Sequence, residues 1–422
     1  MSVTEAAVDT AARGIRSKPV RFIGADKEYW RILVRGAFLL IVTLGLYRFW
    51  LATDIRRFLW AHTAVDGEPL EYSGTAVELL QGFLVAIALL LPIYTVFVIT
   101  VLDLGWLGNL LSAAAVLLLV FISQYGIYLA RRYRLTRTVF RGLRFHQTGS
   151  ALRYSLCAVW WWFLTIVTIG FAYPFNRAAL ERFKMRNTYY GDLQGRFEGS
   201  GWRLFFRGFL LWLAVIFPLL AALSSFTLID WIGVTEAMGG GGDVLARMER
   251  ASPGFFDAVI FGILALIASV FLALLLLPAF HAIVMRWWVS GLRFGQIVSV
   301  SHLRTRDVYF VYLRLVGYVL LFGLVMIAGI FVGLLLIGLI ADFASPQTME
   351  IISVLMMVGT YVVTALGLST LYQAVVTLSV WRLTAESTEL SDTTQIAHVH
   401  AAGESSSPLG EGIADILNLG GI

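Results

Sequence analysis

Six long uncharged stretches constrain this chain more than any other feature. A helix needs about 20 consecutive apolar residues to cross the hydrocarbon core of a bilayer. Six runs meet that length: residues 82–102, 104–130, 208–229, 258–285, 315–341 and 351–381. Membrane β-strands are short and alternate polar with apolar residues. The continuous runs therefore predict an all-α polytopic membrane protein with six spanning helices.

The ends of the chain and its single cysteine add little chemistry. Residues 1–20 contain Glu5 and Asp9 without an apolar core, so we do not expect a cleaved signal peptide. We expect residues 1–20 and the polar residues 383–422 to be disordered tails. Cys157 lies within a hydrophobic segment, and one cysteine excludes an internal disulfide or a multi-cysteine metal site.

The sequence matches itself at a constant offset of 125 residues. Identical pairs at this offset are Tyr29 and Tyr154, Thr43 and Thr168, Gly45 and Gly170, Arg57 and Arg182, and Thr63 and Thr188. So many ungapped matches predict an internal repeat. A second element also recurs, since Gly-Leu-Arg-Phe occupies both 142–145 and 291–294. We divide the membrane region into repeat 1 (21–145), repeat 2 (146–295) and a shortened repeat 3 (296–382).

The first copy carries a family resemblance. It contains Phe-Ile-Gly at 22–24, Glu-Tyr-Trp at 28–30, Thr-Leu-Gly-Leu-Tyr-Arg-Phe-Trp at 43–50 and Tyr-Ser-Gly-Thr at 72–75. These residues resemble the YjgN-like family of bacterial inner-membrane proteins. The second copy departs from the pattern, with Ala-Tyr-Pro-Phe at 172–175. The resemblance implies a polytopic inner-membrane location, and because the family is a domain of unknown function it implies no catalytic residues.

Charge predicts the topology. Lys and Arg near helix ends favour the cytoplasmic side, yet basic residues flank the shorter apolar segments 36–47 and 154–176 at both ends. If both segments crossed the membrane, one strongly basic loop would face outward. We therefore expect both to be re-entrant or interfacial, with both termini cytoplasmic. Eight spanning helices remain the alternative, because residues 154–176 are long enough to span.

Paired helix breaks give the first candidate site. Broken helices in corresponding halves of a transporter expose backbone dipoles to a solute, and Thr43, Gly45, Thr168 and Gly170 fit that description. The alternative is that these small residues permit close helix packing. Opposite charges at equivalent positions, Glu78 and Arg203, suggest an ion pair between repeats, although two independent interfacial charges are equally ordinary.

No catalytic motif is recognisable in the sequence, so we expect neither an enzyme nor a cofactor or metal site. The predicted function is binding or transport of a small solute between repeats. The alternative is a non-transporting scaffold whose basic and aromatic cytoplasmic loops engage anionic lipid headgroups or a protein partner. Nucleic acid is not an expected partner, because membrane topology accounts for the net charge of +5.

Overall fold

The structure is a computed structural model that describes residues 18–103, 105–239, 241, 243–340, 345–402, 409, 413 and 416. The chain divides into two compact units, Met1–Gly201 with Arg286–Ile422, and Trp202–Met285. Each unit is described by itself. Most of the N-terminal residues expected to be disordered, and much of the C-terminal tail, lie outside the described residues.

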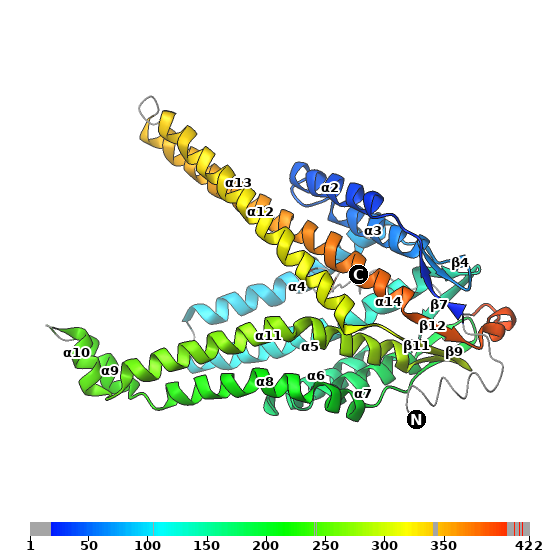
Figure 1. Cartoon of the computed structure of the whole chain (residues 1–422), viewed down its shortest axis with the longest axis horizontal. Coiled ribbons are helices and arrows are strands. Elements are labelled where there is room, and N and C mark those ends of the chain that lie inside the picture. The colour runs from blue at the N-terminus through cyan, green and yellow to red at the C-terminus, as the bar shows by residue number, and fades with distance from the viewer. Residues whose placement is uncertain are drawn as a thin grey trace. The chain divides into compact units, whose positions relative to one another are not determined.

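Within the described residues, six helices are long and apolar enough to cross a membrane, as the sequence predicts. Their candidate spans are Ala76–Ile99 in α4 (Ala76–Asp103), α5 (Gly105–Arg137), α8 (Gly201–Thr227), α11 (Phe255–Gly291), α12 (Thr305–Ile340), and Pro346–Glu386. The last span joins α13 (Pro346–Tyr372), the π-helical turn η1 (Gln373–Thr377) and α14 (Leu378–Glu386). Figure 1 shows α12 and α13 side by side as one long helix pair.

Two much shorter helix pairs occupy the apolar segments that basic residues flank. The first pairs α2 (Asp26–Val42) with α3 (Arg48–Ala61), and the second pairs α6 (Ala151–Val167) with α7 (Tyr173–Arg186). In each pair a five-residue turn reverses the chain, so the two helices pack against each other. Every boundary of the second pair lies 125 residues after its counterpart in the first.

The chain also contains β-structure, so the all-α prediction is wrong on this point. The strands are β1 (Lys18–Pro19), β2 (Arg21–Phe22), β3 (Thr63–Val65), β4 (Glu68–Pro69), β5 (Glu71–Tyr72), β6 (Thr138–Phe140), β7 (Leu143–Gln147), β8 (Thr188–Tyr190), β9 (Leu193–Phe197), β10 (Leu292–Phe294), β11 (Ile297–Ser301) and β12 (Thr388–Ser391). Two of these strands, β1 and β12, lie in the residues expected to be disordered tails.

The strands form a closed antiparallel ring. One sheet runs in the order β1-β12-β11-β10-β9-β8-β7-β6-β5, and the other runs β2-β3-β4. Val20 alone separates β1 from β2, and its N–H donates to the carbonyl of Thr388 at 3.0 Å. Leu70 alone separates β4 from β5, and its N–H donates to the carbonyl of Thr63 at 3.0 Å. These two residues join the sheets at both edges and leave no long edge strand.

Every helix pair leaves the same end of this ring and returns to it. The chain runs from β2 through α2 and α3 to β3, and from β5 through α4 and α5 to β6. It then runs from β7 through α6 and α7 to β8, and from β11 through α12 to α14 and then β12. The second unit is likewise inserted between the paired strands β9 and β10. Tight turns such as Arg141-Gly142 close the opposite end of the ring.

The second unit is a long helix pair with two short helices between its arms. These are α9 (Trp231–Met238) and α10 (Val244–Ala251), whose N-cap residues Asp230 and Asp243 accept from backbone N–H groups. Ile229, Val234 and Phe255 form the core of this end. Further along, the Ser269 hydroxyl donates to the carbonyl of Val215 at 2.9 Å, which joins α11 to α8.

The structure differs from the sequence expectation at the C-terminal side. A disordered tail was expected from residue 383, but α14 continues to Glu386, β12 completes the ring, and a 3₁₀ helix, η2 (Thr393–His398), follows. The proposed repeat boundaries at 145/146 and 295/296 fall within β7 and within the turn between β10 and β11. Strands on either side of these boundaries pair in one continuous sheet.

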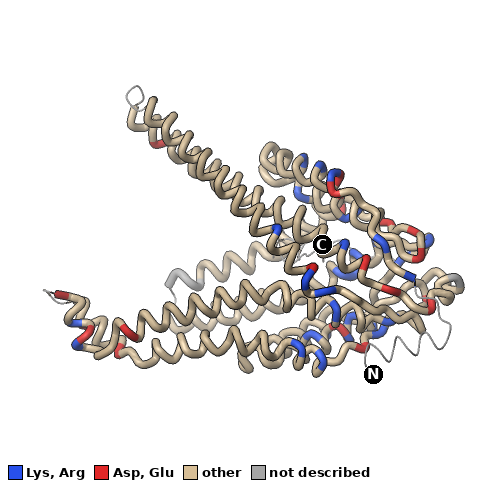
Figure 2. The backbone as a smooth tube through the Cα atoms, viewed as in Figure 1, with Lys and Arg blue, Asp and Glu red and all other residues tan. Residues whose placement is uncertain are grey.

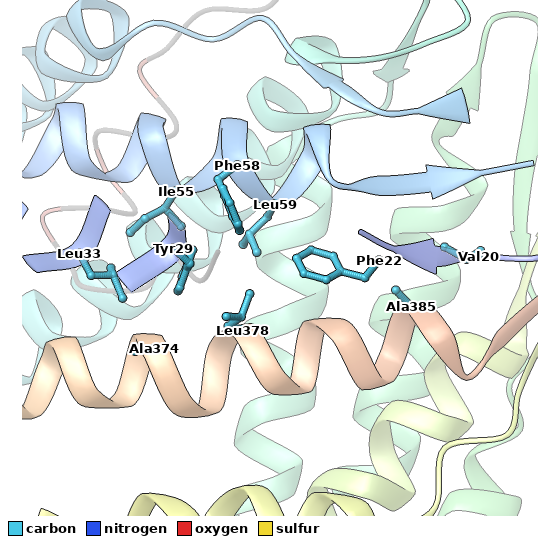
Figure 3. Packing of buried hydrophobic residues seen from close by; sticks show 10 residues of the cluster. All are labelled: Val20, Phe22, Tyr29, Leu33, Ile55, Phe58, Leu59, Ala374, Leu378 and Ala385. Atoms are coloured by element: carbon cyan, nitrogen blue, oxygen red, sulfur yellow. The ribbon is translucent and has the colours of Figure 1, made fainter. Parts of the chain in front are cut away.

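One apolar core of the first unit joins its first described helices to α14. Figure 3 shows Tyr29, Phe58 and Leu59 of the α2–α3 pair facing Leu378 and Ala385 of α14. The Arg382 guanidinium also bonds to the carbonyl of Gly24 at 3.1 Å. This packing fixes the short α2–α3 pair beside the last of the candidate spanning helices.

Candidate functional site

The predicted helix breaks are real, and both are Schellman turns. After α2, the Leu44 N–H donates to Ile41 at 3.2 Å and the Gly45 N–H donates to Leu40 at 2.7 Å. After α6, the Ile169 N–H donates to Ile166 at 3.0 Å and the Gly170 N–H donates to Thr165 at 2.7 Å. This pair of hydrogen bonds satisfies the last carbonyl groups of a helix.

The two threonines complete the same turns. Thr43 Oγ1 donates to the carbonyl of Leu39 at 2.7 Å and accepts from the Tyr47 N–H at 3.0 Å. Thr168 Oγ1 donates to Leu164 at 2.7 Å and accepts from the Ala172 N–H at 3.0 Å. The polar groups of the paired breaks therefore bond within their own turns. In Figure 1 the α2–α3 and α6–α7 pairs lie on opposite sides of the first unit, so the four predicted site residues do not converge on one pocket.

Each turn carries an apolar side chain in a strained position. Leu44 and Ile169 adopt φ angles of 50° and 51°, the left-handed region where glycine is normally found. A β-branched residue there is an outlier. Leu44 is nevertheless 94% exposed and Ile169 is 50% exposed. Both turns thus present an apolar side chain outward at a cost in backbone energy.

The α2–α3 pair carries a basic pocket. Arg31, Arg35, Arg57 and Asp54, together with Ile32 and Phe58, line a hollow of about 420 Å³. Arg35 donates to the Tyr47 hydroxyl at 2.9 Å and to Asp54 at 3.3 Å, so one carboxylate offsets part of the positive charge. In the sequence these arginines are recognisable only as charges that flank an apolar segment, and their grouping into one pocket is visible only in three dimensions.

The surface of α6 that corresponds to the basic surface of α2 is apolar, while the exposed Arg182 of α7 occupies the position equivalent to Arg57. Leu156 and Trp160 stand 125 residues after Arg31 and Arg35, and both are 59% exposed. Phe163, Ile166 and Val167 continue this exposed apolar surface to the turn. The two short pairs therefore share one backbone design, but the exposed surface is basic on α2 and hydrophobic on α6.

The turn of the α2–α3 pair contacts the first turns of α4. The Arg48 guanidinium lies 4.4 Å from the ring centroid of Phe83, and the rings of Phe49 and Phe83 are 5.1 Å apart. Phe83 follows the start of α4 at Ala76 by seven residues, which is about 10 Å along a helix. The tip of the pair thus extends only a short way along the neighbouring membrane helix.

Glu78 has a different partner from the one predicted. Its Oε1 accepts from Arg137 at 2.6 Å and its Oε2 accepts from the Tyr133 hydroxyl at 2.6 Å, so it links the start of α4 to the end of α5. Arg203 lies at the start of α8 in the second unit, where its side chain is exposed.

A buried polar cluster, which the sequence did not reveal, supports the α6–α7 pair. Lys184 Nζ donates to Glu181 Oε1 at 2.5 Å, and Trp288 Nε1 donates to Glu181 Oε2 at 3.1 Å. Arg131 bonds to Gln147 Oε1 at 3.0 Å and to Thr188 Oγ1 at 2.9 Å.

Burial alone would raise the pKa of Glu181, but Lys184 and nearby arginines outweigh it and hold the pKa below its ordinary value. Burial lowers the pKa of Lys184. These contacts join α7 to α5, to strands β7 and β8 and to the end of α11, so the network supports the packing of the α6–α7 pair.

Metal chemistry has no visible basis in the described parts of the chain, where no three His, Cys, Asp or Glu side chains come together. The candidate site is instead a surface. It consists of two strained apolar turns and one basic pocket on short helix pairs that start beside membrane-spanning helices.

The long apolar helices define the class of this protein as a helical membrane protein with several candidate spans. The chain is a member of a family of bacterial proteins of unknown function, DUF898, whose model matches residues 17–416. Its sequence is 29% identical over 141 residues to the inner membrane protein YjgN of Escherichia coli O157:H7, which covers 33% of this chain and 32% of that protein. The YjgN of Escherichia coli strain K12 is 26% identical over 140 residues, with the same coverage.

These comparisons confirm the YjgN-like resemblance. The matched segment spans about a third of the length of the two YjgN proteins. No solved structure matches the chain.

Proposed function

We propose that this protein is a non-enzymatic scaffold of the bacterial inner membrane that holds its strand ring against the cytoplasmic leaflet. One observation carries the proposal, namely that every described helix pair leaves and re-enters the same end of the ring. Helices that begin at one membrane face and return to it must reverse within or beyond the bilayer. The relatives named inner membrane proteins support the same location.

The topology that follows has six spanning helices, with both termini and the ring in the cytoplasm. Charge supports this orientation. Figure 2 shows Lys and Arg gathered around the ring and the adjoining helix ends of the first unit, while the far parts of α12 and α13 carry none. Basic residues near helix ends favour the cytoplasmic side. Lys and Arg of the first unit thus lie on the side of the helices that the proposal assigns to the cytoplasm.

The short helix pairs are internal repeats that enter only the cytoplasmic leaflet. Their boundaries coincide at the 125-residue offset, and helices of 17 and 14 residues extend only about 26 and 21 Å. The charged α2–α3 pair, whose tip lies beside the first turns of α4, is suited to the interface. Helix α6, with its exposed apolar surface, is suited to a deeper re-entrant position. Lipid contact would also explain why both turns retain an outward apolar residue at positive φ.

Anionic lipid headgroups are the proposed partner of the basic pocket. Arg31, Arg35 and Arg57 lie on the pair assigned to the interface, where each basic residue contributes about 1 kcal/mol of attraction to an anionic surface. Guanidinium groups suit phosphate oxygens, because their donors form a planar fork. The scaffold would therefore be anchored by apolar turns and by charge together.

Solute binding between the repeats is the second candidate function. The paired turns support it poorly, because their hydroxyls and backbone N–H groups bond internally. The cavity inside the strand ring supports it better, since strands from every proposed repeat line that space.

Cysteine labelling tests the topology in a background where Cys157 is replaced by serine. Single cysteines at the exposed positions Glu71 and Arg144 mark the ring, and those at Glu236 and Gln347 mark the far ends of the spanning pairs. We expect a membrane-impermeant maleimide to label Glu236→Cys and Gln347→Cys in intact spheroplasts, and to label Glu71→Cys and Arg144→Cys only after lysis.

Two further sites test the short pairs. We expect Leu44→Cys and Ile169→Cys not to react with a water-soluble maleimide added from either face of the membrane. Both should react with a maleimide attached to a lipid tail. Labelling of either turn from the periplasmic face would mean that its helix pair crosses the membrane, which would overturn the proposal. The positions Gly45 and Gly170 are unsuitable for cysteine, because their φ angles are 90° and 86°.

A further inference from the structure

An apolar cavity lies inside the strand ring. Its volume is about 380 Å³, which falls within the roughly 300–1,000 Å³ of small-molecule sites. Strands from around the ring contribute to the wall, and its main apolar side chains are Phe140, Phe145, Tyr190, Phe294, Ile297 and Leu390. An eight-stranded barrel is just filled by its own side chains, so this larger ring leaves interior space.

The polar groups of the wall are bonded within the protein. Trp60 Nε1 donates to Thr138 Oγ1 at 2.9 Å, the Tyr190 hydroxyl donates to the carbonyl of Phe140 at 3.0 Å, and the Ser299 hydroxyl donates to the carbonyl of Val289. Arg293 turns its charge to Glu198 at 3.1 Å. The cavity therefore offers an occupant apolar contact rather than hydrogen bonds, and such a space favours hydrocarbon over water.

The end of the ring away from the helices is covered. Ile396 of η2 lines the cavity from this side. The Gln296 N–H donates to Gln395 Oε1 at 3.1 Å, and the His400 N–H donates to Asp192 Oδ1 at 3.1 Å. Residues 395–400 thus cross the turns between the strands, and we call this segment the cap.

The other end of the cavity lies at the bases of the membrane helices. Leu135 of α5, Val289 of α11 and Trp381 of α14 line it there, each within the last three turns of its helix. If the ring faces the cytoplasmic leaflet as proposed, the apolar molecules nearest to this end are the hydrocarbon chains of membrane lipids.

We propose that the ring is a binding site for one long hydrocarbon chain, supplied by a fatty acid or by a lipid of the cytoplasmic leaflet. Volume, apolar lining, internally bonded polar groups and the covered far end all favour this occupant. The inference relies on the proposed function only for the direction of entry. Binding itself requires no particular membrane orientation.

The test is a titration of the full chain in amphipol, free of detergent, with the fluorescent fatty acid cis-parinaric acid. Ile297→Trp fills the cavity, and Val298→Trp is its matched control, because alternate residues of β11 point to opposite faces and Val298 is absent from the cavity wall. We expect saturable binding that Ile297→Trp weakens by about tenfold or more, because overpacking removes the space. Val298→Trp should bind as the unmodified protein does.

Folding of each variant is checked by gel filtration and thermal unfolding. If Ile297→Trp fails to fold, Leu390→Phe fills less of the same space and takes its place. Equal binding by the filled and control variants, or no saturable binding by the unmodified chain, overturns the proposal. In that case a correct topology from cysteine labelling would leave the scaffold function standing.

A second measurement identifies the source of the chain. Protein extracted with a styrene–maleic acid copolymer is washed, denatured and analysed by lipid mass spectrometry. A fatty acid or a phospholipid enriched in the unmodified protein and the Val298→Trp control, but depleted in Ile297→Trp, supports the site and names its source. The same lipid profile in all three proteins contradicts it.

Discussion

The carboxylate of Glu78 is held by the guanidinium of Arg137 at 2.6 Å, across the base of the α4–α5 helix pair. Tyr133 bonds to the other oxygen of the same carboxylate. Repeat symmetry suggests Arg203 as a partner of Glu78, with two independent interfacial charges as the alternative. The observed pair joins two consecutive helices where both meet the ring, so its role is to hold one helix pair closed at its base.

Charge swaps distinguish the two partners of Glu78. We expect Glu78→Arg to lower stability by about 1–3 kcal/mol, because it leaves like charges facing each other in a partly buried site. Adding Arg137→Glu should restore most of this loss, whereas adding Arg203→Glu should not. Thermal unfolding followed by tryptophan fluorescence measures each protein. Rescue by the Arg203 change would show that repeat symmetry, rather than the observed contact, describes the pairing.

Glycine at the strained turn positions should stabilise the helix pairs. Leu44→Gly and Ile169→Gly relieve the strain of the left-handed conformation, which costs an L-residue about 1–2 kcal/mol. Glycine also loses more conformational entropy on folding, which offsets up to about 1 kcal/mol of this gain. We expect a net gain of up to about 1 kcal/mol in detergent. Leu46→Gly is the control, because Leu46 lies in the same turn without a positive φ. Equal effects at residues 44 and 46 would argue against backbone strain.

The same glycine variants should weaken membrane anchoring. Removal of the Leu44 or Ile169 side chain takes away apolar area that we assign to the lipid, so a lipid-tailed maleimide should label cysteines at neighbouring Leu46 and Phe171 more slowly. Unchanged labelling rates would indicate that the turn side chains do not insert.

Acid should unfold the protein partly through Glu181. The pKa of this carboxyl lies below its ordinary value of 4.5 in the folded state. Its contribution to stability is therefore present above that ordinary value and is lost as the pH falls through the lower folded value. We expect Glu181→Gln to be less stable than the unmodified protein at neutral pH, with the difference shrinking as the solution is acidified. A difference that stays constant with pH would mean that Glu181 does not titrate as its contacts indicate.

Anionic lipid should stabilise the protein through the basic pocket. We expect phosphatidylglycerol, added to the protein in neutral detergent, to raise the thermal midpoint of the unmodified chain. Arg31→Gln combined with Arg35→Gln should remove about half of that rise or more, because both residues are exposed and line the pocket. Arg144→Gln, an exposed change on β7, should leave it intact. Equal losses would reveal a general charge effect.

The cap should be released by a single substitution. Asp192→Ala removes the acceptor for the His400 N–H, so we expect proteases to cut more readily after residue 392, and the fluorescent fatty acid to exchange faster. Asp192→Asn keeps a side-chain oxygen in the same place and should behave like the unmodified protein. If Ala and Asn behave alike, the hydrogen bond does not hold the cap.

The membrane helices were readily predicted from sequence, because hydrocarbon imposes a length and polarity rule that a single run either meets or fails. The turns at Gly45 and Gly170 were found through the repeat, and their positive φ explains why glycine occurs there. Their function was harder to predict, since the hydrogen bonds that satisfy Thr43 and Thr168 are visible only in three dimensions.

The strands could not be predicted from the sequence, for a physical reason. Segments of two to five residues are too short for an alternating pattern to separate from chance. The recurring Gly-Leu-Arg-Phe was noticed, and its two copies prove to be turn and strand at 142–145 and helix end and strand at 291–294. Pairing of Lys18 with Leu390 joins residues that no local signal connects.

Closure of the ring by β12 against β1 has a consequence for synthesis. Ribosomes deliver β1 first and β12 last, while each helix pair can insert as soon as it emerges. The first strand must therefore wait, with an open edge, until β12 has been synthesised. Truncated or stalled chains would reach the membrane with their helices in place and an unsealed edge exposed to the cytoplasm, where unpaired strands invite aggregation. Quality control could thus distinguish finished from unfinished molecules by that edge alone.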